Sequence, residues 1–221
     1  MLDLLLPQRC LICSTLGAQV CACCRSALRH IGPPLCDRCG TPTAWPVRRC
    51  GECTGRRLAF VRARAAVEYD EPVRRLVAAW KERGLRRLAK VAAEVVAENV
   101  ARPDSSCVTF VPADPDRRLK RGHHAAERLA AELSALWDLP LQPLLRRARG
   151  SSRQRGLSQA HRRRNVAGAF RATGPCSARL VLVDDVYTTG STATAAASAL
   201  RRNGASRVEV VTFARAVRFK S

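Results

Sequence analysis

The chain has 221 residues, 47% of them apolar, which is enough for one α/β domain with a small appendage. No run approaches the roughly 20 consecutive apolar residues of a membrane-spanning helix, and residues 1–7 lack the basic start of a signal peptide, so we expect a cytoplasmic protein without a membrane span. The formal net charge of +21 indicates either the ordinary basic surface of an arginine-rich protein from a GC-rich genome or a polyanionic partner.

Cysteines dominate the start of the chain, where eight of them form four pairs with Cys-x2-Cys spacing. This clustering favours a metal, because a reducing compartment does not maintain a disulfide framework. Four thiolates make one tetrahedral zinc site, so the pairs predict one structural zinc site or two interlocked zinc ribbons. An iron–sulfur cluster and redox thiols are the alternatives, and the spacing does not say which pairs share a metal. The candidate ligands are Cys10, Cys13, Cys21, Cys24, Cys36, Cys39, Cys50 and Cys53.

Residues 1–58 are rich in cysteine, proline and glycine and show little helical or strand periodicity. A segment this short needs a metal or another cross-link, because it cannot bury a sufficient apolar core. We therefore predict a Cys-rich zinc-ribbon module over residues 1–58 and a second domain over residues 59–221.

Strand and helix patterns alternate through the second domain. The order strand–helix–strand predicts an α/β fold with a parallel twisted sheet, right-handed crossovers and flanking helices. The predicted strands lie at 62–69, 107–111, 180–183 and 207–213, and the predicted helices at 71–83, 85–100, 123–137 and 192–202.

Basic residues crowd the loop 112–122, which follows the second predicted strand. Such cations would neutralise the charge that builds on a diphosphate as it leaves, although a solvated basic loop is the alternative. The candidates are Arg117, Arg118, Lys120 and Arg121.

The segment 139–183 contains ten arginines and no acidic residue. Gly150 and Gly156 lie among these arginines, and this combination fits a basic lid that closes over a diphosphate. It fits a groove for single-stranded nucleic acid equally well, although residues 138–169 lack the aromatic side chains on which bases stack. The segment therefore does not decide between an enzyme and a nucleic-acid binder.

The apolar run 180–183 leads directly into Asp184 and Asp185. Ligands of open α/β sheets bind where such strands end. The following turn offers hydroxyls, a glycine that lets the backbone approach a ligand, and a helix N-terminus that attracts an anion. Two carboxylates that can hold a diol, next to a phosphate cradle, match a sugar 5-phosphate; a capped turn without function is the alternative. The candidate phosphate-binding residues are Thr188, Thr189, Gly190, Ser191 and Thr192.

Four apolar residues, two acidic residues and a Thr-Thr-Gly-Ser-Thr turn make residues 180–192 resemble the signature of the type I phosphoribosyltransferases. The resemblance implies that Asp184 and Asp185 contact the ribose 2- and 3-hydroxyls of phosphoribosyl diphosphate, bound together with Mg²⁺. It implies that residues 188–192 hold the 5-phosphate and that loop 112–122 binds the pyrophosphate. Purine-salvage members carry an aspartate at the position of Thr188, so this threonine argues against a purine acceptor.

The rest of the chain resembles the ComF family of competence-associated, phosphoribosyltransferase-like proteins. We take Lys81, Gln154 and Arg162 from the shared motifs as further pyrophosphate or lid candidates. The residues His123-His124-Ala125 depart from the aromatic, asparagine and glutamine that usually follow Arg-Gly. The motifs are the Cys-x2-Cys pairs, Trp80-Lys81-x2-Gly84, Val111-Pro112 with Arg121-Gly122, Gln154-x2-Leu157-x4-Arg162-x2-Asn165-x4-Phe170, and residues 180–192.

Two functions follow from the resemblance and the charge. The first is an enzyme that binds Mg–phosphoribosyl diphosphate and transfers the phosphoribosyl group to an acceptor that the sequence does not identify. The second is a non-catalytic competence factor that uses the same fold to bind single-stranded DNA, in line with the family's association with the DNA-uptake machinery.

Overall fold

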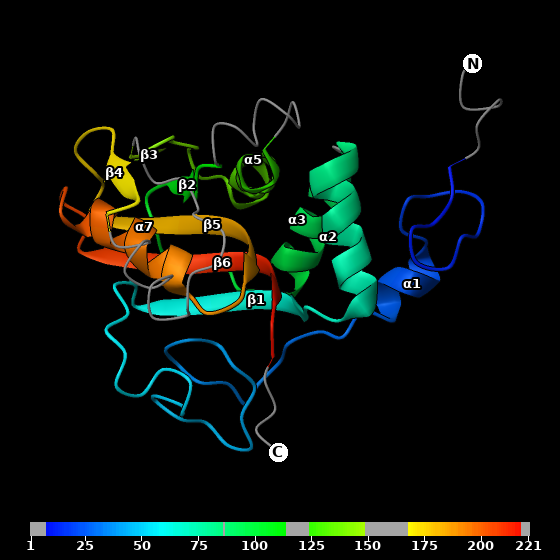
Figure 1. Cartoon of the computed structure of the whole chain (residues 1–221), viewed down its shortest axis with the longest axis horizontal. Helices are drawn as coiled ribbons and strands as arrows, with labels where there is room; N and C mark the ends of the chain where they lie inside the picture. The colour runs from blue at the N-terminus through cyan, green and yellow to red at the C-terminus, as the bar shows by residue number, and fades with distance from the viewer. Residues whose placement is uncertain (1–7, 86, 114–123, 149–167, 218–221) are drawn as a thin grey trace, which may run out of the picture.

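A computed structural model describes residues 8–85, 87–113, 124–148 and 168–217. Its centre is a four-stranded sheet in which every neighbouring pair of strands is parallel (Figure 1). Because all four strands run the same way, their carboxyl ends share one edge of the sheet. The strand order is β1 (Arg62–Glu68), β6 (Arg207–Arg215), β5 (Arg179–Tyr187) and β2 (Val108–Phe110).

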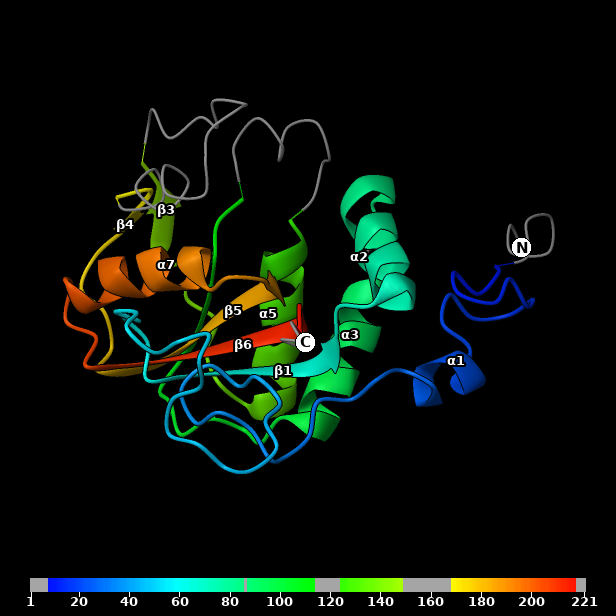
Figure 2. The same ribbon diagram turned by 60° about the horizontal axis from the view of Figure 1, so that its bottom comes forward.

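Apolar side chains cover both faces of the sheet, because successive residues of a strand point to opposite faces. In β5, Val181 and Val183 join the core under α3 (Leu88–Asn99) and α5 (Ala125–Trp137), whereas Leu180 and Leu182 join the core under α7 (Ser191–Arg201). Helix α2 (Glu71–Arg83) stands beside α3 (Figure 2). This parallel sheet between helices confirms the predicted α/β class. None of the helices that the structure describes is long and apolar enough to cross a membrane.

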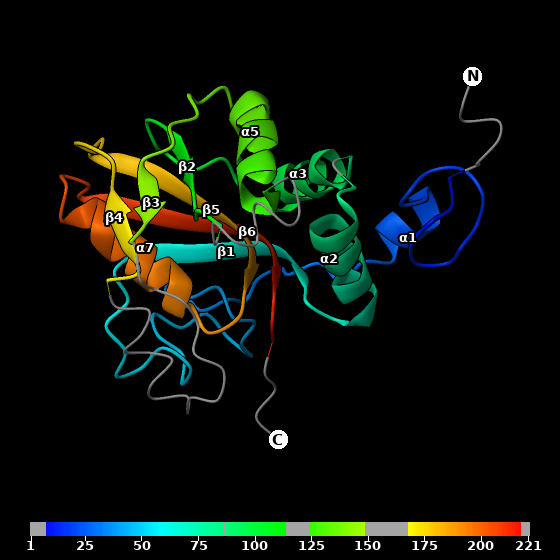
Figure 3. The same cartoon turned by 45° about the horizontal axis from the view of Figure 1, so that its top comes forward.

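A small antiparallel sheet lies on the α7 side of the molecule (Figure 3). It consists of β3 (Leu145–Arg147) and β4 (Phe170–Ala172), and the buried Leu145 and Phe170 belong to the same core as α7. No helix or strand was predicted within residues 140–171. Strands β3 and β4 have three residues each, which is too short to show a periodicity in the sequence.

The Cys-rich residues form two parts in different places (Figure 1). The first part contains α1 (Ala22–Ser26) and lies against α3, where Arg25 Nη1 donates to Glu94 Oε2 at 2.7 Å. The second part lies along β1, where the Ala63 amide donates to the Arg38 carbonyl at 3.0 Å. Three cysteines of the second part are buried in the core under α7 (the α7-side core), and Cys10 and Cys24 of the first part are buried in the core under α3 and α5. Both parts are therefore packed against the sheet domain, and a domain division after residue 58 stays a prediction.

Two element boundaries differ from the predicted ones by more than two residues. The helix predicted from residue 85 begins at Leu88, because Gly84 takes a left-handed φ of 68° at the end of α2 and turns the chain. Strand β5 continues past Val183 to Tyr187, because it pairs with β6 as far as Arg215. The acidic pair thus lies within the last residues of a strand and not after it.

Candidate functional site

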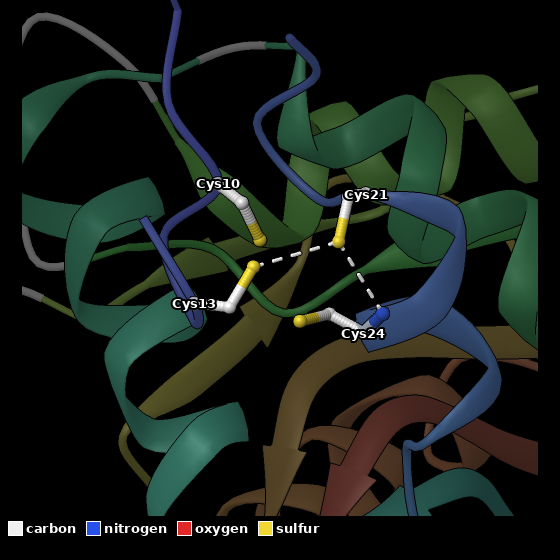
Figure 4. A group of neighbouring side chains, drawn as sticks. All are labelled: Cys10, Cys13, Cys21 and Cys24. Atoms are coloured by element: carbon white, nitrogen blue, oxygen red, sulfur yellow. Dashed lines mark hydrogen bonds between the residues drawn. The ribbon is translucent and has the colours of Figure 1, made fainter. Parts of the chain in front are cut away.

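Eight cysteines gather into two clusters, each formed by two consecutive pairs, so the ribbons are not interlocked. Within each cluster, the sulfur atoms all lie within 4.8 Å of one another. Thiolates bound to one zinc ion at ~2.3 Å would lie about 3.8 Å apart, so both clusters fit a tetrahedral zinc site. The first site comprises Cys10, Cys13, Cys21 and Cys24 (Figure 4), and the second comprises Cys36, Cys39, Cys50 and Cys53.

The backbone favours the thiolate form of one cysteine in each cluster. Burial alone would raise the pKa of Cys10, but backbone hydrogen bonds lower it to about 6. Burial opposes backbone hydrogen bonds in the same way at Cys36, where the pKa falls to about 7 and the Cys50 amide donates to Sγ at 3.3 Å. The thiolate is the metal-binding form. Since the protein supplies all four ligands of each site, a bound zinc ion has no open position for substrate and its role is structural.

The turn between β5 and α7 lies at the carboxyl edge of the sheet. Gly190 precedes α7 with a left-handed φ of 70° and, as a glycine, offers no side-chain cap. The Ser191 amide donates to Thr189 Oγ1 at 3.4 Å, and the Thr192 amide of the first turn can donate to an anion. The hydroxyls of Thr189 and Ser191 lie 3.0 Å apart beside these amides. Asp184 and three of the predicted phosphate-binding residues, Thr188, Gly190 and Thr192, line one small cleft, whereas Asp185, Thr189 and Ser191 are not among its lining residues. Its lining residues are Asp184, Val186, Tyr187, Thr188, Gly190, Thr192, Ala193 and Thr212.

The Asp184 carboxyl is unusual within this cleft. Burial and the neighbouring Asp185 charge raise its pKa to about 7, and Lys81 opposes this shift. Its Oδ1 accepts a hydrogen bond from the Asp185 amide at 2.9 Å. Carboxyls with strongly raised pKa values concentrate at functional sites. A cation or another donor bound in the cleft would favour the ionised form.

The raised pKa of Asp184 predicts a stability penalty above neutral pH. As pH rises from about 4 to about 7, the unfolded chain loses this proton while the folded chain retains it, so stability falls. Asp184→Asn keeps the Oδ1 acceptor but cannot ionise. We expect this variant to melt roughly 2–4 °C above the wild type at pH 8 and to show no gain at pH 4. Thermal unfolding of the ligand-free proteins at both pH values tests this, and an equal difference at the two values would contradict it.

Two cations reach the acidic pair from other elements. Lys81 of α2, a predicted candidate, places Nζ 2.7 Å from Asp185 Oδ2. Arg147 of β3 lowers the pKa of Asp184 and donates from Nε to the Pro112 carbonyl at 3.3 Å, where loop 112–122 begins. Arg147 was not among the predicted site residues, because nothing in the sequence distinguishes it from the other arginines of its segment. Thr212 was also missed, although it is the only polar residue of the run 210–214.

Six predicted candidates lie outside the described residues, so their roles stay predictions. All six belong to the two basic segments that the sequence assigns to pyrophosphate binding and to a lid. They are Arg117, Arg118, Lys120, Arg121, Gln154 and Arg162.

Comparison with known proteins gives matches over nearly the whole chain. A double zinc ribbon domain family matches residues 1–54. The DNA utilization protein YhgH of Salmonella typhimurium is 31% identical over 203 residues, which are 86% of this chain and 88% of that protein. Competence protein F of Haemophilus influenzae is 29% identical over 209 residues, 89% of this chain and 90% of that protein. The chain belongs to the ComF family. In this ComF protein, the double zinc ribbon and the two cysteine clusters together make two Cys₄ zinc sites.

Solved structures that resemble this ComF protein include phosphoribosyltransferases. Orotate phosphoribosyltransferase from Aeropyrum pernix is 26% identical, with a TM-score of 0.37 and coverage of 67% of each chain. Purine phosphoribosyltransferase from Pyrococcus horikoshii is 15% identical, with a TM-score of 0.35 and coverage of 60% of this chain and 91% of that one. At these TM-scores the likeness carries no argument about function.

Proposed function

We propose that this ComF protein binds the magnesium complex of phosphoribosyl diphosphate and transfers the phosphoribosyl group to an acceptor. The observation that supports this most is the cleft at the β5–α7 turn, where Asp184 with its raised pKa lies beside the hydroxyl-rich start of α7. The fold and the family names of its relatives agree with a phosphoribosyltransferase-like protein used in DNA uptake. A cytoplasmic location is part of the proposal and rests on the cysteine usage.

Each part of the ligand has a matching group in this arrangement. The amide of Thr192 and the hydroxyls of Thr189 and Ser191 would hold the 5-phosphate, while Asp184 and Asp185 would hold the ribose hydroxyls. Lys81 and Arg147 bring positive charge to the same edge of the sheet. Bound Mg²⁺ would supply charge neutralisation for the departing diphosphate. The protein would act by orienting the sugar and stabilising charge, without a covalent nucleophile.

Release of pyrophosphate tests whether the site turns over. Purified protein is incubated with labelled phosphoribosyl diphosphate and Mg²⁺, alone and with nucleobases or single-stranded DNA. An enzyme releases pyrophosphate faster when its acceptor is present. Saturable binding of phosphoribosyl diphosphate without release of pyrophosphate in any mixture would show that the protein binds the ligand but does not transfer it. This result would contradict the proposed transferase activity.

A second candidate function, binding of single-stranded DNA, is supported by a cavity lined with arginines. A cavity of about 470 Å³ lies between the small sheet and the end of α7 and contains three arginines. Arg146 and Arg171 are directly opposite in the β3–β4 pair, where like charges repel. Among the described residues, no carboxylate forms an ion pair with either of them or with Arg202. A phosphate of the DNA backbone would relieve this repulsion.

Salt dependence measures how many phosphates such a site holds. We expect the affinity for a single-stranded oligonucleotide to fall steeply with salt, and Arg146→Gln combined with Arg171→Gln and Arg202→Gln to reduce the slope of log K against log[salt] by about 2. The matched control makes three glutamine substitutions at Arg74, Arg75 and Arg179, exposed arginines paired with surface carboxylates. Equal losses in both triple variants would show a general charge effect, and absence of binding at low salt would exclude this function.

A further inference from the structure

One buried side chain joins the second zinc site to the phosphate-binding turn. Arg215, the last residue of β6, is 1% exposed. Its guanidinium donates to the Cys39 carbonyl, to the Thr41 hydroxyl and, at 2.8 Å, to the Glu52 carboxylate. It also lies 3.7 Å from Cys39 Sγ. All of these partners belong to the loops that hold the second zinc site.

One face of the same guanidinium lies over the ring of Tyr187, the last residue of β5. The Arg215 Cζ atom is 4.7 Å from the centroid of the Tyr187 ring, within the range of a cation–π contact. The two residues are also paired in register across β5 and β6. Tyr187 is 4% exposed, and the edge-on ring of Phe60 holds it from another side.

Tyr187 in turn supports the phosphate-binding turn directly. A Cβ atom at Gly190 would overlap the Tyr187 hydroxyl and ring, so the backbone of the turn rests on this side chain. The left-handed φ of Gly190 fixes the direction in which α7 starts. A shift of the Tyr187 ring would therefore move the amides that face the anion.

A second contact runs in parallel from the same part of the chain. Arg56, just after the second zinc site, donates to the Thr189 carbonyl in the turn. At the first zinc site, Arg25 directly follows the last ligand; it pairs with Glu94 and Glu98 of α3 and makes no described contact with the turn. The two zinc sites thus differ in what they touch.

The energetics make this connection stiff. Burying a guanidinium without its partners costs several kcal/mol. Arg215 therefore keeps its hydrogen bonds to the Cys39 carbonyl and to Glu52, and the loops that carry the zinc ligands determine where these two groups lie. We propose that Arg215 and Tyr187 are positioning residues through which the second zinc site sets the conformation of the phosphate-binding turn. This inference rests on the proposed function, because it gives the turn its ligand.

Hydrogen exchange and ligand binding together test the connection. Tyr187→Leu and Arg215→Lys remove the aromatic support and the forked donor, while Tyr187→Phe keeps the ring. We expect both disruptive variants to exchange the amides of 189–194 at least about tenfold faster, with two zinc ions retained and ribose 5-phosphate affinity reduced at least about tenfold. Tyr187→Phe should behave like the wild type. Arg25→Met, at the first zinc site, is the matched control and should leave exchange in the turn unchanged.

The outcomes separate this inference from the proposed function. If wild-type protein fails to bind ribose 5-phosphate while exchange in the turn responds as expected, the ligand is wrong and the connection stands. If the wild type binds the ligand and neither Tyr187→Leu nor Arg215→Lys alters exchange or affinity, the connection is wrong. Loss of zinc from both sites in Tyr187→Leu and Arg215→Lys would show general unfolding and would also overturn the connection. Lower thermal stability of Tyr187→Leu with unchanged exchange and affinity would show that Tyr187 has a purely structural role, and this result too would overturn the connection.

Discussion

Substitution of a ligand at the second zinc site is expected to damage the sheet domain more than the same substitution at the first site. Cys50→Ser removes one of four ligands from a site whose other cysteines are buried in the α7-side core. Structural zinc binding contributes on the order of 10 kcal/mol to small metal-dependent folds. We expect this variant to bind one zinc ion per chain in place of two, and its melting temperature to fall by at least about 10 °C.

Cys21→Ser provides the matched control for this zinc prediction. Both cysteines are partly exposed zinc ligands, and serine at position 21 can still cap α1, which it precedes. The control should also lose one zinc ion, but the main unfolding transition should stay within a few degrees of the wild type. Zinc content by mass spectrometry and differential scanning calorimetry measure both effects. Equal destabilisation of the two variants would contradict the different packing of the two sites.

Removal of the acidic pair is expected to abolish binding of Mg–phosphoribosyl diphosphate. Asp184→Ala with Asp185→Ala deletes both carboxylates proposed to hold the ribose and leaves the phosphate-binding turn in place. The lost charge-assisted hydrogen bonds predict an affinity at least about 100-fold lower, equivalent to about 2.8 kcal/mol. Isothermal titration calorimetry gives the affinity directly.

A variant with the same charge change elsewhere controls for the effect of net charge. Glu71→Ala with Asp104→Ala removes two exposed carboxylates, each paired with surface arginines. This control should bind within about twofold of the wild type, because exposed ion pairs contribute little. Unchanged affinity in the Asp184/Asp185 variant would show that the ligand does not use the acidic pair.

The sequence predicts the elements of the sheet domain well because their patterns are local. Each of these patterns is formed by residues that are close together in the sequence. Examples are the apolar run 180–183 and the hydroxyl-rich turn that follows it. The full length of β5 could not be predicted in this way, since its last residues are ordered by pairing with β6. Neither could the short strands β3 and β4, which form through pairing across the intervening segment.

The site was predictable only where a motif marked it. Lys81 was selected from its motif, and the structure places its Nζ beside Asp185. Arg215 shows the opposite case. From the sequence alone, an arginine at the end of an apolar strand is expected to be exposed. The partners that bury Arg215, Cys39 and Glu52, lie 176 and 163 positions away in the chain. The cysteine spacing likewise left open which pairs share a zinc ion, a question that the three-dimensional arrangement answers.

The central claim is that the β5–α7 turn binds a ribose 5-phosphate, and backbone NMR during a titration with ribose 5-phosphate tests it most directly. We expect saturable chemical-shift changes at the amides of the turn, which are those of Thr189, Gly190, Ser191 and Thr192. The amides of Asp184 and Asp185 should shift with the same dependence on ligand concentration. Absence of saturation at millimolar ligand, or shifts confined to Arg146, Arg171 and Arg202, would contradict the assignment of this turn.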